Sequence, residues 1–367
     1  MPQTVISATG VYTPPNVLTN EELVDSYNKW VAKEQASCNP NTTLQESSAD
    51  FIKKASGIES RYCVDKHGIL DISRMRPHLR TRPDEEISIQ AEMGLFASRK
   101  ALKAAGVEGS EVDAVLVACS NYQRPYPAIA VELQDALGAS GFAYDMNVAC
   151  SSATFGIAQG QALLQSGAAR KVLVVSPEIC TGHLNFRDRD SHFIFGDACT
   201  AILLEPDDQT ESREKYEIVG SRLSTKFSNN IRNNRGFLTR CEDRLDCDPT
   251  LLFYQEGRKV FKEVTTLVSA LLEEHLSEHD LDPKSLKCMW LHQANASMNA
   301  LIAKRLLGRE ATPEEAPSIL ETYANTSSAG SIIAFHHHRQ HLKPGDLGVI
   351  CSFGAGYSIG SVIVRRL

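Results

Sequence analysis

Hydrophobic runs of strand length alternate along the first half of the chain with stretches of helical spacing. Apolar runs at 113–120, 171–178 and 200–206 lie around two helical patterns, at 127–137 and 151–166. This alternation is typical of an α/β fold in which strands gather into a sheet and helices cover its faces. The pattern therefore predicts a sheet built from strands that lie far apart in the chain.

The second half repeats this rhythm. An apolar strand is expected at 285–293, a helix at 294–307, and two further strands at 346–354 and 360–367. The polar segment after residue 206 suits a link between the two parts. We therefore divide the chain into an N-terminal half, residues 1–207, and a C-terminal half, residues 208–367.

Intervals between marked residues agree between the halves. Cys119 and Cys150 are 31 residues apart, and His292 and Asn325 are 33 residues apart. Cys150 begins the cluster CSSA and Asn325 begins the cluster NTSSAG, and both clusters open a predicted helix. Such a repeat indicates a duplicated unit. It would bring Cys150, His292 and Asn325 to equivalent positions of two halves that face each other.

Two polar segments, 33–48 and 64–86, carry no clear periodicity. Segments of this length without a pattern are usually loops that cover a site, or surface loops without function. We expect both to be insertions of the N-terminal half.

Composition narrows the function. The chain is 42% hydrophobic and 23% charged, as in ordinary globular proteins. Its net charge of −7 argues against nucleic acid as a partner. No apolar run has the ~20 residues of a membrane helix, and we expect no signal peptide. The ten cysteines include no CxxC pair, which favours reduced thiols in the cytoplasm.

The surroundings of Cys150 suit a nucleophile. A thiol at the start of a helix faces unpaired N–H groups and the positive end of the helix dipole, which lower its pKa. The small residues after it leave room for an acyl group, and its own N–H can face an oxyanion. We interpret Cys150 as a thiol that becomes acylated.

The other two marked residues have simpler alternatives. His292 ends an apolar strand, where a histidine often serves only as a hydrogen-bonding residue. Asn325 could cap the helix that follows it. The Gly-rich segment 352–361 could be a plain turn between strands or could supply a second oxyanion N–H. It lacks the strand–GxGxxG–helix context of dinucleotide binding.

A set of motifs in a fixed order identifies a family resemblance. They are GIESRY, VACSSATFG, NFRDRDSHFIFGDACTAILL, EGRKVF, LHQAN, YANTSSAG and FGAGYSIGS. Together they resemble β-ketoacyl-(acyl carrier protein) synthase III of the thiolase superfamily, nearly from end to end. The resemblance implies a five-layered αβαβα fold of two duplicated halves and a homodimer.

The resemblance also implies the reaction. Cys150 would take an acyl group from acyl-CoA, and His292 and Asn325 would then assist the decarboxylation of malonyl-acyl carrier protein. The oxyanion donors would be the backbone N–H groups of Cys150 and Ala355. No metal and no cofactor is implied, since acyl-CoA and the carrier protein are substrates.

Further contacts carry over residue by residue. Arg189 and Phe51 match a pair that binds the adenine of coenzyme A, and Asn295 lies in the LHQAN substrate motif. Tyr126 matches an aromatic residue that reaches across the dimer interface to line the acyl pocket. Two basic residues are expected to dock the carrier protein, namely Lys304 and Arg305.

Other condensing enzymes are alternatives. A thiolase would use a second cysteine, for which Cys351 is the candidate, but a one-residue offset turns Cys351 to the other face of its strand. A hydroxymethylglutaryl-CoA synthase would need a glutamate for which the sequence shows no motif. A polyketide or head-to-head condensing enzyme, and a non-catalytic acyl-binding relative, stay open. For the primer, we favour a medium-chain acyl-CoA of about eight carbons over acetyl-CoA, because the chain is longer than ordinary family members.

Overall fold

The computed structural model describes residues 3–37, 44–234, 236 and 249–367. The strands of its main sheet are β1 (Thr4–Tyr12), β4 (Ala114–Ala118), β5 (Phe142–Met146), β6 (Val172–Ile179), β7 (Asp197–Pro206), β8 (Tyr216–Ser228), β11 (Leu286–Leu291), β12 (Leu347–Gly354) and β13 (Gly356–Arg366). Within the described ranges these nine strands run in the order β11-β12-β13-β8-β1-β7-β6-β4-β5. The strands predicted for both halves are therefore present.

The two halves of the sheet have the same pairing pattern. In the first half β4 pairs parallel with β6, and β6–β7 and β7–β1 are antiparallel. In the second half β11 pairs parallel with β12, and β12–β13 and β13–β8 are antiparallel. The halves meet where β1 pairs with β8, at Val5–Glu217 and Ile6–Tyr216. The boundary expected near residue 207 falls between β7 and β8.

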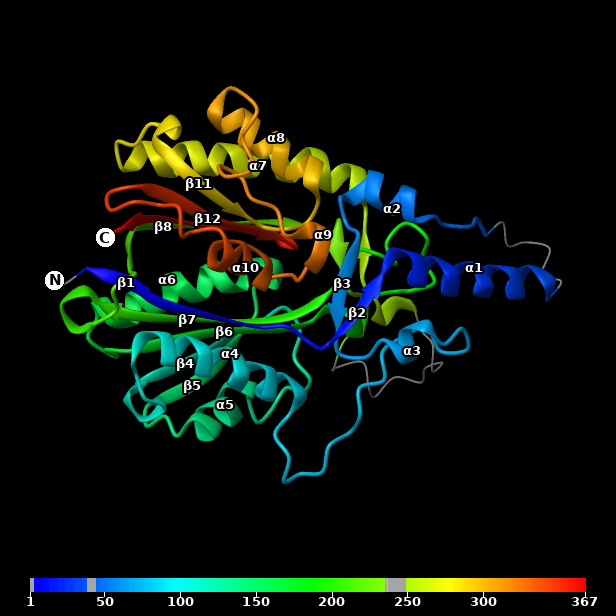
Figure 1. Cartoon of the computed structure of the whole chain (residues 1–367), viewed down its shortest axis with the longest axis horizontal. Coiled ribbons are helices and arrows are strands. Elements are labelled where there is room, and N and C mark those ends of the chain that lie inside the picture. Colours follow the sequence, from blue (N-terminus) through cyan, green and yellow to red (C-terminus); the bar gives the residue numbers. More distant parts are fainter. Residues whose placement is uncertain (1–2, 38–43, 235, 237–248) are drawn as a thin grey trace.

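Helices divide the molecule into five layers (Figure 1). The main helices are α4 (Ile89–Ala105), α5 (Ile129–Leu137), α6 (Ser152–Gln165), α7 (Gly257–Glu278), α8 (Ala296–Leu307) and α10 (Ala329–His337). Helices α7 and α8 cover the second half of the sheet, and α4 and α5 cover the first half, while α6 and α10 lie between the two halves. The expected αβαβα architecture is confirmed.

Helix α6 is rich in small residues because it lies between two sheet layers. A Cβ on Gly156 would come within 2.7 Å of a Val174 methyl, and one on Gly160 within 2.5 Å of a Leu204 methyl. Strand β6 is buried along its whole length, as expected for a strand covered on both faces. This packing holds the start of α6, and with it Cys150, in a fixed place.

A smaller group of elements projects from one end of the molecule (Figure 1). They are β2 (Asn16–Thr19), α1 (Asn20–Ala36), α2 (Ala49–Ser56), β3 (Ser60–Cys63) and α3 (His67–Leu70). The remaining short elements are β9 (Ile231–Arg232), β10 (Tyr254–Gln255) and α9 (Leu320–Tyr323). No helix in the described ranges is long and apolar enough to span a membrane.

The segments expected as insertions are only partly loops. Helix α1 continues to Ala36, so the loop prediction is wrong for residues 33–36. Thr19 and Glu22 form a capping box at the start of the helix, and its buried face packs on the fold. Residues 38–43 of the same segment lie outside the described residues. The segment 64–86 is irregular except for α3.

Candidate functional site

Cys150 lies in a short 3₁₀ turn, Ala149–Ser151, that leads directly into α6. Ala149 has a φ of 48°, a left-handed conformation that costs a non-glycine residue energy. Gly354 packs against the nucleophile so closely that a Cβ there would lie 2.6 Å from Cβ of Cys150 and 3.0 Å from its Sγ. The thiol is therefore positioned by the end of β12 as well as by its own turn.

His292 follows β11 directly and is 2% exposed. Its backbone N–H donates to the carbonyl of Cys351 at 2.7 Å, and its ring packs edge-on against Phe353 at 5.2 Å. Burial lowers the pKa of His292 to about 4, so the ring is neutral at pH 7. Nδ1 of this buried ring has no hydrogen-bond partner among the described residues. The side chain thus has donor or acceptor capacity left for a substrate.

Asn325 does not cap the helix that follows it. Helix α10 begins four residues later, after Ser328. The Asn325 Oδ1 accepts the N–H of Ser327 at 2.8 Å, and Asn325 also forms an isolated bridge with Phe195. Ala324 and Ser327 both have left-handed φ values, 55° and 50°. A strained loop around a buried amide is typical of a functional position.

Cys150, His292 and Asn325 line one cavity of about 330 Å³. The other lining residues are mostly apolar, and the aromatic ones are Phe51, Phe193, Phe195, Phe253, Phe261 and Phe353. Since these three residues come from both halves, the structure brings together what the spacings of the sequence suggested. A thiol, a neutral imidazole and an amide in an apolar cavity can carry out acyl transfer and stabilise an oxyanion.

The electrostatics of Cys150 differ from our expectation. Burial raises the pKa of its thiol to about 11, and the nearby Ser327 hydroxyl and the backbone of Ala355, which lower it, do not compensate. The helix-start argument counted only the local backbone, whereas desolvation disfavours the thiolate. In the free protein the nucleophile is a neutral thiol. Its proton must leave when the substrate carbonyl arrives.

Both expected oxyanion donors lie at the thiol. The backbone of Ala355 interacts with the Cys150 side chain, and Gly354 beside it lines the cavity. The backbone N–H groups of Cys150 and Ala355 are therefore close to the place where a thioester on Cys150 would have its carbonyl oxygen. The position of Ala355 agrees with the second donor that the sequence predicted.

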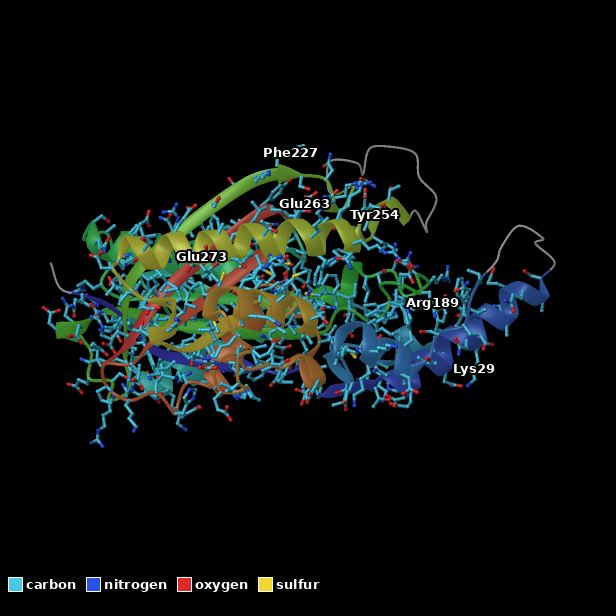
Figure 2. All side chains as sticks on the ribbon, turned by 90° about the horizontal axis from the view of Figure 1, so that it is seen from above. Lys29, Arg189, Phe227, Tyr254, Glu263 and Glu273 are labelled. Carbon is cyan, nitrogen blue, oxygen red and sulfur yellow. The ribbon has the colours of Figure 1, made fainter. Side chains whose placement is uncertain are left out.

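Arg189 and Phe51 contact each other near the cavity. The Arg189 guanidinium lies 4.1 Å from the centre of the Phe51 ring, and its Nε donates to the carbonyl of Glu46 at 2.7 Å. Phe51 lines the cavity. Figure 2 shows Arg189 toward the end of the molecule from which α1 projects. The pair forms a flat cationic and aromatic surface near the cavity that contains Cys150.

The other expected substrate contacts differ from each other. Asn295 lines the cavity, but its side chain is used within the fold: Oδ1 caps α8 through Ser297 and Met298, and Nδ2 donates to the carbonyl of Ala55 at 2.8 Å. Tyr126 is 81% exposed and does not line the cavity of its own chain. A role of Tyr126 in the pocket therefore requires a second chain.

The two expected docking residues lie at the end of α8. Lys304 forms an ion pair with Glu310 at 2.5 Å, and Arg305 donates to the hydroxyl of Thr265 on α7 at 3.3 Å. Helix α7 adds three exposed cations in its first turns, Arg258, Lys259 and Lys262, next to residues that line the cavity. We had not singled these out, although the EGRKVF motif contains Arg258.

Much of the cavity wall comes from a region to which we assigned no role. The cavity is lined by Ile231, Phe253, Gln255 and residues of α7, whereas the described residues of 33–48 and 64–86 do not line it. Figure 2 shows the labelled Tyr254 beside the start of α7. The aromatic run FY at 253–254, just before EGRKVF, was the available signal.

Cys351 has no place in the site. It is fully buried among apolar side chains and does not line the cavity. Burial raises the pKa of its thiol far above the usual range. The next residue, Ser352, is paired through its hydroxyl with Ser331 at 2.8 Å. Cys351 therefore cannot serve as the acid or base of a thiolase.

The fold and the site together define a thiol-dependent condensing acyltransferase with a thiolase-like architecture. The profile described as 3-Oxoacyl-[acyl-carrier-protein (ACP)] synthase III matches residues 144–226, and that of its C terminal matches residues 276–366. A beta-ketodecanoyl-[acyl-carrier-protein] synthase of Pseudomonas aeruginosa is 58% identical over 323 residues, covering 88% of this chain and 92% of the relative.

More distant relatives agree. A beta-ketoacyl-[acyl-carrier-protein] synthase III of Granulibacter bethesdensis is 28% identical over the full length of both chains. The crystal structure of 3-oxoacyl-[acyl-carrier-protein] synthase III from Aquifex aeolicus has the same fold, with a TM-score of 0.77 and 24% identity over 99% of both chains.

The chain belongs to the β-ketoacyl-[acyl-carrier-protein] synthase III family. It is an acyltransferase that condenses an acyl-CoA primer with malonyl-acyl carrier protein in fatty acid synthesis.

Proposed function

We propose that the primer is a medium-chain acyl-CoA of about eight carbons. The observation that carries this proposal is the 58% identity to an enzyme named for a ten-carbon β-ketoacyl product. Condensation with malonyl-acyl carrier protein adds two carbons and releases CO2, so a ten-carbon product requires an eight-carbon primer. The apolar, aromatic-lined cavity at Cys150 supports a long acyl chain. Six additional methylenes contribute up to about 5 kcal/mol when buried, at ~0.8 kcal/mol each.

In the proposed first step, Sγ of Cys150 forms a bond to the acyl carbonyl and the bond to the sulfur of coenzyme A breaks. The proton of the Cys150 thiol passes to the sulfur of the departing coenzyme A, which leaves as a free thiol. The N–H groups of Cys150 and Ala355 stabilise the oxyanion that forms between these events. The high pKa of the free thiol fits a nucleophile that loses its proton during attack.

In the second step, malonyl-acyl carrier protein loses CO2 and leaves an enolate with its charge on the thioester oxygen. We propose that His292 and Asn325 donate hydrogen bonds to this oxygen. The enolate carbon then bonds to the acyl carbonyl carbon, the bond from that carbon to Sγ of Cys150 breaks, and the thiolate that leaves takes a proton from water to regenerate the thiol. The neutral state of His292 is compatible with this role, because a neutral imidazole still carries one N–H that can donate the hydrogen bond.

The surface around the cavity suits the two substrates. The adenine of coenzyme A would stack at Phe51 and Arg189. The Arg189 guanidinium lies 4.1 Å from the centre of the Phe51 ring, so the adenine must either separate the two groups or stack on the outer face of the pair. The acidic carrier protein would dock on Lys304 and Arg305 of α8 together with Arg258 and Lys262 of α7. Helices α7 and α8 contact each other, and Arg305 donates to the Thr265 hydroxyl of α7.

We further propose a homodimer in the cytoplasm. Strand β5 ends the sheet and has a free edge, which is a common pairing surface for a second copy. The exposed ring of Tyr126 could then enter the cavity of the partner. The seven described cysteines are all free thiols, which suits a reducing compartment. A sedimentation mass of one chain at micromolar concentration would contradict the dimer.

The primer is tested by kcat/KM for acetyl-, butyryl-, hexanoyl- and octanoyl-CoA with malonyl-acyl carrier protein. We expect the ratio to rise toward octanoyl-CoA. Ile231→Phe or Ile231→Trp places a larger side chain in the cavity wall and should lower the octanoyl value and spare the acetyl value. A steady fall from acetyl-CoA upward in the wild-type enzyme would instead assign the protein the ordinary initiating role.

A further inference from the structure

Glu178 is a buried carboxylate in the centre of the molecule that the reaction described above does not use. It lies near the end of β6 and is 0% exposed. None of the ion pairs among the described residues includes it. A buried charge without a cation persists only when hydrogen bonds replace its solvation.

Ser120 and Ser328 supply four donors to this carboxylate, and the Cys180 thiol donates a longer contact to it at 3.9 Å. The N–H and hydroxyl of Ser120 donate to it at 3.1 and 2.6 Å. The N–H of Ser328 donates at 3.1 Å, and the hydroxyl of Ser328 donates as well. A carboxylate accepts all four of these bonds without supplying a proton. Ser120 belongs to the first half of the chain and Ser328 to the second, so Glu178 joins the two halves.

The Ser120 contact leads to the nucleophile. The carbonyl of Ser120 accepts from Nδ2 of Asn147 at 2.8 Å, and Oδ1 of Asn147 accepts the N–H of Ala149 at 2.9 Å. Ala149 is the left-handed residue directly before Cys150. Glu178 is thus connected through two residues to the turn that presents the thiol.

The Ser328 contact leads to the donor side of the site. Ser328 follows the strained loop of Asn325 to Ser327, in which Oδ1 of Asn325 holds the N–H of Ser327. Left-handed residues such as Ala324 and Ser327 cost roughly 1–3 kcal/mol each and persist only where surrounding contacts fix them. Glu178 supplies such a contact from outside the loop.

We propose that Glu178 is a positioning residue that fixes the Cys150 turn against the Asn325 loop, with Ser120 as its contact to the first and Ser328 as its contact to the second. The proposal rests on the functions proposed above for Cys150 and Asn325. Catalytic groups must be held within about 0.5 Å of their productive geometry. One carboxylate that is linked to the Cys150 turn through Ser120 and Asn147, and that contacts Ser328 directly, sets the separation between Cys150 and Asn325.

The chemistry of the carboxylate is essential to this role. Glutamine has the same shape but lacks the charge that strengthens the three bonds at Oε1, and its amide nitrogen would replace Oε2 and face the Ser120 hydroxyl, which would have to turn and accept. Aspartate keeps the charge but is one methylene shorter, so it cannot reach both serines at once. We therefore expect neither Glu178→Gln nor Glu178→Asp to restore the wild-type geometry.

The test compares the two contacts. Acyl transfer to Cys150 is measured by mass spectrometry in a single turnover with octanoyl-CoA, and decarboxylation by release of labelled CO2 from malonyl-acyl carrier protein. Ser328→Ala should slow CO2 release far more than acylation, and Ser120→Ala should slow acylation more. Glu178→Gln should slow both by about 10²-fold, the typical cost of a misplacement of 1 Å.

Ser331→Ala is the matched control. It also removes a buried hydroxyl from α10, but its partner is Ser352 and not Glu178, so both steps should stay close to wild type. If Ser120→Ala and Ser328→Ala slow both steps by the same factor, or slow neither, Glu178 has no positioning role. These two variants decide the question even if Glu178→Gln fails to fold.

A separate variant distinguishes this proposal from the function on which it rests. If Asn325→Ala leaves CO2 release unchanged, the role proposed for Asn325 is wrong and the Ser328 contact has nothing to position. If Asn325→Ala slows CO2 release while Ser328→Ala does not, the proposed function stands and only the role of Glu178 is refuted.

Discussion

The turn at Cys150 and the loop at Asn325 are equivalent places in two halves with the same strand pairing, yet they are built differently. Each follows a left-handed alanine, Ala149 or Ala324, and each leads to a helix between the sheet layers. Cys150 is separated from its helix by one residue, whereas Asn325 is followed by a further left-handed residue and an Asx turn before α10 begins. The duplicated scaffold therefore fixes where the two loops lie, and the local backbone of each loop determines how Cys150 or Asn325 is presented.

This difference separates the two chemical steps. In the proposed mechanism, the first loop carries the thiol that forms a covalent bond and must be reachable from the cavity. The second loop and His292 carry the proposed donors, which are 6% and 2% exposed and would act on a charge that forms later. Variants in the first loop should thus affect acylation, and variants in the second should affect decarboxylation.

The largest effect is expected for Cys150→Ala. Loss of the thiol should abolish condensation and remove the acyl adduct, because Cys150 alone among the seven described cysteines lines the cavity. Mass spectrometry of the peptide that contains residue 150, after incubation with octanoyl-CoA, checks this. An adduct at the wild-type level in the variant would refute the assignment of the nucleophile.

Alanine in place of His292 or Asn325 comes next. Each change removes one donor from the enolate oxygen, and loss of one such donor typically costs 10²–10³ in rate. Release of labelled CO2 from malonyl-acyl carrier protein should fall by this factor, while single-turnover acylation of Cys150 falls far less. Equal losses in both steps would contradict the division between the two loops.

Gly354→Ala tests the opposite case, in which the first loop is crowded and not removed. The new Cβ would lie 2.6 Å from Cβ of Cys150, so the turn must shift. We expect acylation to slow by about 10², as for other small misplacements of catalytic groups. Gly182→Ala is the control, because its Cβ would meet only ordinary contacts, the nearest at 3.5 Å. A wild-type acylation rate in Gly354→Ala would show that the contact is not tight in solution.

The smallest effect concerns pH. The raised pKa of Cys150, about 11, means that the thiolate fraction of the free enzyme increases tenfold per pH unit through the range 7 to 10. Alkylation of Cys150 by iodoacetamide should therefore increase over this whole range without a plateau. A plateau above pH 8 would show that the thiol ionises more easily than its buried position indicates.

The sequence predicted those parts of the site that depend on duplication and motif order. Similar spacings in the two halves predicted that Cys150, His292 and Asn325 lie together. Regular apolar periods predicted the strands and the helices α6 and α8. The pKa of Cys150 was predicted in the wrong direction, since local sequence shows the start of a helix but not the tertiary burial around the sulfur.

Two further features lay outside what periodicity reveals. The wall formed by Ile231 and Phe253 comes from short, irregular segments, whose side chains face the cavity only because of the tertiary fold. Glu178 is a single charged residue in an apolar strand. The four donors of Ser120 and Ser328 are 58 and 150 residues away from it along the chain. Contacts of that range leave no local pattern.

The neutral thiol has a consequence for survival under oxidative stress. Peroxides and most electrophilic poisons attack thiolates, and with a pKa of about 11 roughly one Cys150 in 10⁴ is ionised at pH 7. An idle enzyme is thereby shielded from oxidation without a protective partner or a reducing system at its side. A covalent inhibitor would have to resemble the substrate and bind in the apolar cavity before it reacts. A compound that is only a reactive electrophile would modify the thiolates of other proteins first.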